Sequence, residues 1–242
     1  MLVSDNIFQS RVTKSRILRY GIDMKPILFV IATLAFTSSA WAACDHPYFP
    51  SAANSTWLYQ NSLKNTQNTT RILSNNGSSF VLENNIGKLK VKNTLKCESD
   101  GSLTQTEYPS MTGMNANIKI ETLSYEGAAF PPAAQWLVGA SWINKFKVKM
   151  NIKMGTRETN ASGTMTIVSK ITAEESVKVP AGTFTALKVM QTIQQDMTTI
   201  MGGKSIPMKN TITTTSWFAR GVGLVKSVAS TITTQLLKFT KP

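Results

Sequence analysis

The chain has 242 residues, 42% of them hydrophobic, and its 26 lysines and arginines exceed its 13 aspartates and glutamates, giving a formal charge of +13. One histidine and two cysteines argue against a histidine-based catalytic triad and against a zinc centre, which needs several such ligands. The basic excess favours anionic partners, and a surface charged mainly for solubility is the alternative explanation.

The N-terminal region has the three parts of a secretory signal peptide. A cationic start at residues 24–26 precedes a ten-residue apolar core at 27–36 and an Ala-Trp-Ala pattern at 40–42. Cleavage after residue 42 is therefore expected, and residues 1–23 are interpreted as a non-native upstream extension, or alternatively as a long basic start of the signal. An uncleaved anchor is disfavoured because the apolar run is shorter than the roughly 20 residues that cross a bilayer.

The mature chain, residues 43–242, keeps a formal charge of +10 and has a size typical of a single domain. Two aromatic-proline entries, each followed by a strand that opens on tryptophan, at Trp57 and at Trp142, suggest an internal duplication. Its halves would be residues 43–127 and 128–242. Chance recurrence of common hairpin signals is the alternative, and in either case we expect one β-rich domain.

The two cysteines, Cys44 and Cys97, both remain after cleavage. In an oxidising compartment such an even pair predicts a disulfide, which would tie the N-terminus to an early strand. Lipidation of Cys44 is the alternative. It is disfavoured because Trp41 occupies the position where lipoprotein signals usually have leucine, and because Cys97 would be left without a partner.

Alternation of polar and apolar residues with period two runs through almost all of the mature chain, which predicts β-strands, and only residues 133–138 suggest a short helix. Short strands separated by turn signals such as Asn75-Asn76-Gly77 predict an all-β fold with a curved antiparallel sheet, as a half-open barrel or a sandwich. The clearest predicted strands are residues 88–92, 145–154, 163–171, 176–179, 184–192, 210–218, and 224–237 with a break.

Lysines alternate with other residues along two of these strands. Because alternate residues of a strand share a face, the lysines would line one side and the apolar residues the other. An anionic surface or polymer would relieve the repulsion between their ammonium groups, and protection of an exposed sheet edge is the alternative role. The candidate contacts for an anionic surface are Lys88, Lys90, Lys92, Lys96, Lys145, Lys147, Lys149 and Lys153.

Catalytic, metal and nucleotide-binding motifs are not apparent. His46 lies beside the predicted cleavage site, and we expect it to be an exposed terminal residue. Glu174 and Glu175 would point to opposite faces of a strand, which argues against a pair of catalytic carboxylates. We therefore expect a protein that is not an enzyme and that needs no cofactor or metal.

The apolar faces carry many methionines, with four of them late in the chain. A lining of adaptable methionines suits a hydrophobic cavity, but methionine also fills ordinary cores, and the core role is favoured. The four late methionines are Met190, Met197, Met201 and Met208.

Three phrases of the sequence are similar to a known family. They are CDHPYFP at residues 44–50 with Trp57 soon after, SVKVPAGTF at 176–184 and WFARGVGLVK at 217–226. Together they resemble the TapB-like family of uncharacterised bacterial envelope proteins, a domain of unknown function. The resemblance implies an exported, mostly antiparallel β protein with cysteines at the positions of Cys44 and Cys97. The chain departs from the family in being lysine-rich and in having Asn54 where a glycine is expected.

Two of these phrases also predict hairpins, in which Pro180 and Gly182 turn the chain and Gly221 and Gly223 let a strand bend. We expect an exported protein of the bacterial periplasm or cell surface that binds an amphiphilic or anionic envelope component on its curved sheet. Such a component would be a lipid, lipopolysaccharide or an acidic envelope polymer. We expect no specific nucleic acid partner and no transmembrane span after cleavage. The alternative is a structural accessory of a surface appendage or envelope complex, in which exposed sheet edges pair with a partner protein.

Overall fold

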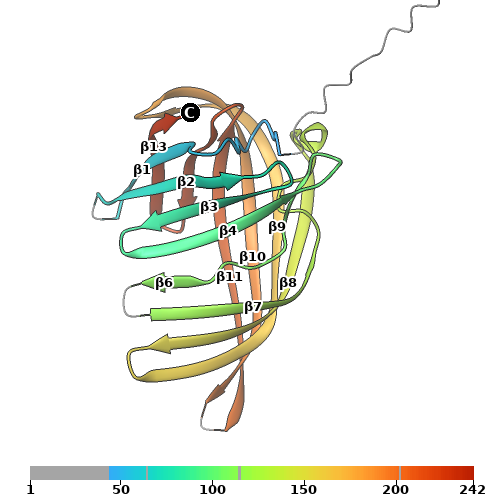
Figure 1. The fold of residues 1–242 in the computed structure, drawn as a ribbon, viewed down its shortest axis with the longest axis vertical. Coiled ribbons are helices and arrows are strands. Elements are labelled where there is room, and N and C mark those ends of the chain that lie inside the picture. The colour runs from blue at the N-terminus through green and yellow to red at the C-terminus, as the bar shows by residue number, and fades with distance from the viewer. Residues whose placement is uncertain (1–43, 64, 114–115, 202) are drawn as a thin grey trace, which may run out of the picture. The chain divides into compact units, whose positions relative to one another are not determined.

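The computed structural model describes residues 44–63, 65–113, 116–201 and 203–242. The predicted signal peptide at 24–42 and the predicted extension at 1–23 lie outside these residues. Within them, all strands belong to a single antiparallel sheet, and the one helical element is the 3-10 turn η1 (Ala133–Gln135), inside the segment where a short helix was predicted (Figure 1). The prediction of an all-β fold is confirmed.

Thirteen strands make up this sheet. Those of the first part of the chain are β1 (Thr56–Asn61), β2 (Gln67–Asn75), β3 (Ser79–Ile86), β4 (Leu89–Cys97), β5 (Leu103–Gln105), β6 (Met111–Gly113) and β7 (Ala116–Glu126). Those of the second part are β8 (Ser141–Met154), β9 (Arg157–Val179), β10 (Gly182–Met201), β11 (Lys204–Ala219), β12 (Gly223–Ala229) and β13 (Ile232–Thr240).

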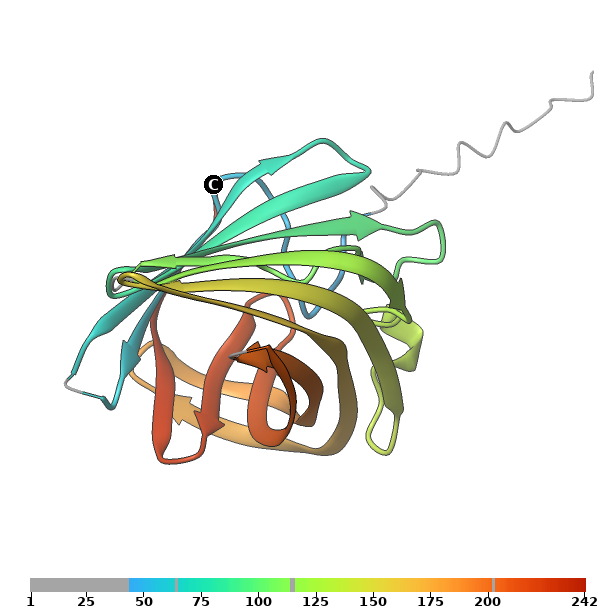
Figure 2. The same cartoon turned by 90° about the horizontal axis from the view of Figure 1, so that it is seen from below.

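The sheet is a meander that curves back on itself. Most neighbouring strands are also neighbours in sequence, and β1 pairs with β13, so the first and last strands lie side by side. β4 pairs with β3 on one side, and on the other side it pairs with β5 through three residue pairs and with β6 through only two. The sheet is therefore strongly curved but incompletely closed, which is the half-open form of the two that the sequence predicted (Figures 1 and 2).

β9 and β10 are longer than predicted: β9 joins the predicted strands 163–171 and 176–179, and β10 extends the predicted strand 184–192 at both ends. Their register shifts between Lys188 and Val189, and a bulge of this kind bends a strand and increases its twist. The bent hairpin reaches across to β13, where the N–H of Ala181 donates a hydrogen bond to the carbonyl of Leu236 at 3.0 Å. The predicted break in the last strand lies at Ser230, whose φ of 53° separates β12 from β13.

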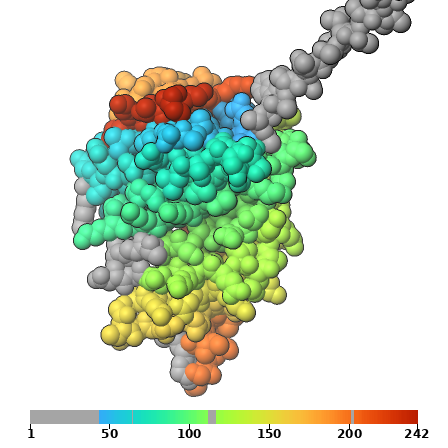
Figure 3. Space-filling model, in the orientation of Figure 1, coloured from blue at the N-terminus to red at the C-terminus, as the bar shows by residue number. Residues whose placement is uncertain are grey.

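Buried side chains form three clusters along the sheet. The largest contains Trp57, Ile72 and Phe80 from β1–β3 together with residues of β4, β9 and β11–β13. A second surrounds Trp136 and Phe218, and a third lies around Phe146 and Met197 on β8–β10. The first cluster lies under the strands β1–β4 that cover the upper part of the face shown in Figure 3, and it encloses the cavity described next.

Candidate functional site

A cavity of about 290 Å³ lies on the concave face of the sheet. Its walls come from β1–β5 on one side and from β10–β12 on the other, and the segment before β1 closes one end with Phe49 and Pro50. The two walls are far apart in sequence, so the curvature of the sheet creates the cavity.

Aromatic side chains line one part of the cavity, and backbone hydrogen bonds fix their orientation. Trp57 donates from Nε1 to the carbonyl of Val222 at 2.6 Å, and the Tyr59 hydroxyl donates to the carbonyl of Leu224 at 3.0 Å. The rings of Phe49 and Phe130 are in contact, with centroids 4.7 Å apart. Burial raises the pKa of Tyr59, so its hydroxyl stays protonated and remains a hydrogen-bond donor.

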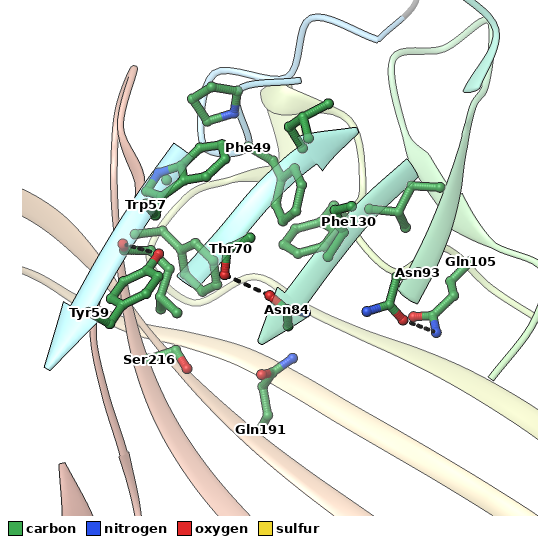
Figure 4. A pocket seen from close by; sticks show the side chains of 17 residues that line it. Phe49, Trp57, Tyr59, Thr70, Asn84, Asn93, Gln105, Phe130, Gln191 and Ser216 are labelled. Carbon is green, nitrogen blue, oxygen red and sulfur yellow. Dashed lines mark hydrogen bonds between the residues drawn. The ribbon is translucent and has the colours of Figure 1, made fainter. Parts of the chain in front are cut away.

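Neutral polar side chains line the opposite part. Thr70 Oγ1 donates to Asn84 Oδ1 at 2.6 Å, and Gln105 Nε2 donates to Asn93 Oδ1 at 3.3 Å. Figure 4 shows Asn84 with Gln191 and Ser216 across the cavity from the rings of Trp57, Phe49 and Phe130. The cavity therefore has an aromatic part and an amide part, as an amphiphilic ligand requires.

The cavity lining is electrically neutral. Among the described residues that line it, none is an aspartate, glutamate, lysine, arginine or histidine. Burying an ion without a partner is costly, so this lining disfavours an anionic ligand head and favours a neutral one.

A disulfide holds the segment that closes the cavity. Cys44 and Cys97 are joined, with Cα atoms 5.0 Å apart, as the sequence predicted. The bond connects the start of the described chain to the last residue of β4. Cys44 lies five residues before Phe49, and Cys97 lies two residues after Leu95, and both of these neighbours line the cavity. Because Cys44 is oxidised in this bond, its sulfur is not available for lipidation.

His46 is buried, and the expectation of an exposed terminal residue was wrong. Its side chain is 2% exposed and lies against the ring of Trp136, with centroids 5.2 Å apart. Nδ1 accepts a hydrogen bond from the N–H of Tyr48 at 3.3 Å, and Nε2 lies 3.0 Å from the carbonyl of Pro131, to which it donates. The ring is therefore a neutral imidazole that holds this segment against the loop before η1. Tertiary packing thus buries a residue that lies beside the predicted cleavage site.

This burial predicts a loss of stability in acid. Burial lowers the pKa of His46 from its ordinary value of 6.5, against smaller opposing effects of Pro131 and Asp45. As the pH falls below that value, the unfolded chain takes up the proton first, so stability is complete above it and declines below it. We expect the urea midpoint to fall between about pH 7.5 and pH 5.5. The variant His46→Gln, which does not titrate, should lose less over this range, and an equal decline in both proteins would contradict the assignment.

The predicted lysine rows lie on the outer, solvent-exposed face, away from the cavity. Along β8, Lys145, Lys147 and Lys149 are exposed and alternate with buried Phe146 and Val148, as the period of two predicted. On β4, Lys90, Lys92 and Lys96 are exposed in the same way, and Lys88 lies in the turn before the strand.

Acidic residues accompany these lysines on neighbouring strands. Glu126 is opposite Lys145 and Glu121 is opposite Lys149, across the pairing of β7 with β8. Ion pairs join Lys153 to Glu158 at 3.3 Å, Lys96 to Glu98 at 3.1 Å and Lys92 to Glu83 at 3.9 Å. This compensation reduces the repulsion that an anionic partner was expected to relieve. Edge protection does not explain the row on β8 either, because β7 and β9 flank that strand.

None of the described methionines lines the cavity, and the core role that the sequence favoured holds for Met197. Met197 is buried in the cluster around Phe146, whereas Met190 and Met208 are 42% and 52% exposed. The side chain of Met201 lies outside the described part of the structure. The polar and ring contacts of the cavity come from amide and aromatic side chains instead.

The predicted turn residues lie in turns or at the first residue of the next strand. Pro180 lies in the turn between β9 and β10, and Gly182, with a φ of 138°, is the first residue of β10. Gly221 and Gly223, with φ of 74° and 89°, connect β11 to β12 beside a register shift at Trp217. A Cβ on Gly223 would lie 3.3 Å from Pro50 and 3.7 Å from Trp57 Nε1, so this glycine lets the closing segment approach the cavity wall.

Two further features are absent from the described residues. Within the described ranges, no group of three or more histidine, cysteine, aspartate or glutamate side chains is placed to hold a metal ion. In that same part of the chain, no helix has the length and apolar character needed to cross a membrane.

Sequence reasoning missed the amides of the cavity. Asn84 lies two residues after the buried Leu82, and Asn93 lies two residues before the buried Leu95. Both asparagines thus occupy the inward positions of alternating strands, where an apolar residue is usual. A polar amide at such a position is the signal that could have identified them.

Comparison with solved structures gives distant likenesses. A candidate exported protein with a YmcC-like fold from Bacteroides fragilis has a TM-score of 0.47 at 12% identity, over 81% of this chain and 100% of that one. A candidate lipoprotein from Parabacteroides distasonis has a TM-score of 0.46 at 17% identity, also over 81% and 100%. The hypothetical lipoprotein YmcC from Escherichia coli has a TM-score of 0.36 at 11% identity, over 84% and 90%.

Comparison with protein families is more informative. No curated protein matches the sequence. The DUF3108-like family matches residues 57–236, from the cavity tryptophan of β1 to the middle of β13. The match does not test membership of the narrower TapB-like family, which stays a prediction. The chain belongs to the DUF3108-like family.

Proposed function

We propose that the protein is an exported, non-catalytic binding protein of the bacterial envelope that holds a small, neutral, amphiphilic molecule in its concave cavity. The observation that carries this proposal is the division of an uncharged cavity into an aromatic part and an amide part. An anionic component on the outer lysine rows is less well supported, because acidic residues lie beside those lysines.

The size of the cavity limits the ligand. A volume of about 290 Å³ is near the lower end of the range of roughly 300–1,000 Å³ found for small-molecule sites. The ligand is accordingly a small molecule or one short apolar chain with its head group. Its apolar part would lie against Trp57 and Phe130, and its neutral head would reach Asn84 and Gln191.

Export is supported by two features. Residues 24–42 have the pattern of a cleavable signal, and a disulfide between Cys44 and Cys97 is typical of proteins that fold in an oxidising compartment. We infer a location in the periplasm or at the cell surface, where amphiphilic envelope components are available.

Two fluorescent probes test the neutral character of the site on the oxidised mature chain. N-phenyl-1-naphthylamine is apolar and uncharged, and 8-anilinonaphthalene-1-sulfonate has the same rings with an added sulfonate. We expect the neutral probe to bind at least about tenfold more tightly, a difference of about 1.4 kcal/mol, because the cavity offers no cation to the sulfonate. Equal or tighter binding of the sulfonate would contradict the proposal.

A cavity-filling variant tests the place of binding. Ser216 is 5% exposed and lines the cavity, so Ser216→Phe should weaken binding of the neutral probe at least about tenfold, since one ring occupies much of the volume. The matched control is Thr213→Phe, at an exposed position of the same strand. The smaller change Ser216→Val is measured in parallel, with circular dichroism to verify folding. Unchanged binding in folded variants would place the probe elsewhere.

A further inference from the structure

The hairpin of β10 and β11 ends in exposed apolar side chains. Ile200 is 59% exposed, Ile206 is 41% exposed and Met208 is 52% exposed. Ile200 is opposite Ser205, whereas Ile206 and Met208 are opposite Thr199 and Met197. Because side chains alternate along a strand, Ile200 lies on one face of the hairpin and the other two lie on the opposite face. This end of the hairpin therefore exposes apolar groups to water on both faces.

Basic side chains surround these apolar groups. Lys204 and Arg157 are exposed, and Lys209 has a side chain that is 78% exposed. Asp196 forms an ion pair with Lys209 at 3.3 Å. Ion pairs to Lys204 or Arg157 are not found among the described residues. The local charge is therefore positive.

The neighbouring turn adds to the same surface. Asn160 of β9 is opposite Ile200 of β10, so the β8–β9 turn lies beside the end of the β10–β11 hairpin. That turn exposes Met154, which is 63% accessible, next to Arg157. Figure 1 shows both turns in the lower part of the molecule, away from the disulfide-linked segment.

The free edge at this end of the sheet is poorly suited to pairing with a strand of a partner protein. Before Thr214, where pairing with β12 begins, β11 has no neighbour on its second edge among the described residues. Pro207 lacks an N–H and lies within this free part, with Lys209 two residues away. Proline and lysine on an edge strand are features that oppose pairing with another strand.

We propose that this end of the sheet, defined by Ile200, Ile206 and Met208 with Lys204 and Lys209, docks on a bilayer that contains anionic phospholipids. The apolar side chains enter the boundary between head groups and acyl chains, and the ammonium groups lie at the lipid phosphates. Apolar groups beside a local excess of basic groups match the two layers of such a surface. The proposal does not depend on the cavity and goes beyond the proposed function by naming where the protein meets its membrane.

Vesicle sedimentation tests the proposal with the oxidised mature chain. Vesicles of phosphatidylcholine are compared with vesicles of phosphatidylcholine and phosphatidylglycerol. We expect binding to the anionic vesicles, weakened about 30-fold in Lys204→Gln/Lys209→Gln, since each surface lysine contributes about fivefold. Ile206→Ser/Met208→Ser should weaken binding at least about tenfold through the lost burial of two apolar side chains.

Two matched variants control for general effects of charge and hydrophobicity. Lys145→Gln/Lys147→Gln removes the same charge from the middle of β8. Leu137→Ser/Val138→Ser removes apolar side chains that are 65% and 55% exposed before the start of β8, at the end opposite Met154. Both controls should bind anionic vesicles within about twofold of the parent, because neither touches the docking end.

Three outcomes would overturn the proposal. The first is equal weakening in the controls, which indicates non-specific charge or hydrophobic attraction, and the second is unchanged binding in the hairpin variants. The third is a change of oligomeric state in the hairpin variants without loss of vesicle binding, which assigns the surface to a protein partner. Binding of N-phenyl-1-naphthylamine to every variant is measured alongside, so that failure of the docking surface and failure of the cavity remain distinguishable.

Discussion

The double variant Cys44→Ser/Cys97→Ser is expected to lose about 4 kcal/mol of unfolding free energy. The two cysteines are 53 residues apart, and a cross-link that closes a loop of this length removes about that much chain entropy from the unfolded state. Folded domains have a free energy of unfolding of only about 5–15 kcal/mol, so the variant loses a large part of its stability. Urea denaturation of the mature chain, oxidised and reduced, measures the difference.

The same variant separates the disulfide from the two side chains. Reduction of the parent protein should reproduce the loss, whereas the double variant should not respond to reductant. We also expect weaker binding of N-phenyl-1-naphthylamine, because Phe49 and Pro50 line the cavity in the segment that the disulfide holds. A loss of less than about 1 kcal/mol would show that the unfolded chain is already compact around these residues.

Gly163→Ala is expected to lower the free energy of unfolding by about 3 kcal/mol, the upper end for overpacking. A Cβ at this position would lie 2.1 Å from the carbonyl oxygen of Asp196 and 2.7 Å from the Cα of Met197. These are backbone atoms of β10, so a change of side-chain rotamer cannot relieve the contact and the two longest strands must separate. The effect is read from urea denaturation.

The control for this substitution is Gly155→Ala in the β8–β9 turn. Gly155 has a φ of 59° and open space around its Cβ position, so the expected loss is only about 1 kcal/mol, from backbone conformation alone. Equal losses in the two variants would mean that β9 and β10 adjust freely at Gly163. A larger loss at Gly163 supports close contact of these strands beside the core of Phe146 and Val148.

The cavity and the docking end together suggest how a ligand would pass from a membrane to the protein. The hairpin end that we propose to meet the bilayer belongs to β10 and β11, and both strands also supply cavity residues, Gln191 and Ser216. A neutral amphiphile that leaves a membrane would thus encounter a protein already held at that surface. The vesicle and probe measurements test the two parts separately.

Much of the fold could be predicted because local patterns determine it. Phe146 and Val148 alternate with lysines, so β8 could be recognised and its faces assigned from period alone. Cys44 and Cys97 were the only cysteines of the chain, and in an oxidising compartment that leaves one intramolecular pairing. A break within residues 224–237 could also be predicted, although its position at Ser230 and the merging of two predicted strands into β9 could not.

The candidate site was largely beyond prediction from local patterns. Nothing near His46 in sequence indicates that Trp136 and Pro131 will bury it, because those residues lie on a distant loop. Asn84, Asn93 and Gln191 come from three strands that only the curvature of the sheet brings around one space. The sequence around each of these residues is that of an ordinary strand, and only their common position around the cavity suggests a binding role.

By itself the sequence determined the all-β class, the alternation of each main strand and the disulfide, since these depend on residue type and short-range spacing. Only the tertiary structure decided which inward faces meet, where a cavity stays open and which apolar groups remain exposed at the β10–β11 end. The physical reason is that strand periodicity is encoded locally, whereas curvature, register shifts and cavity volume result from the packing of all thirteen strands.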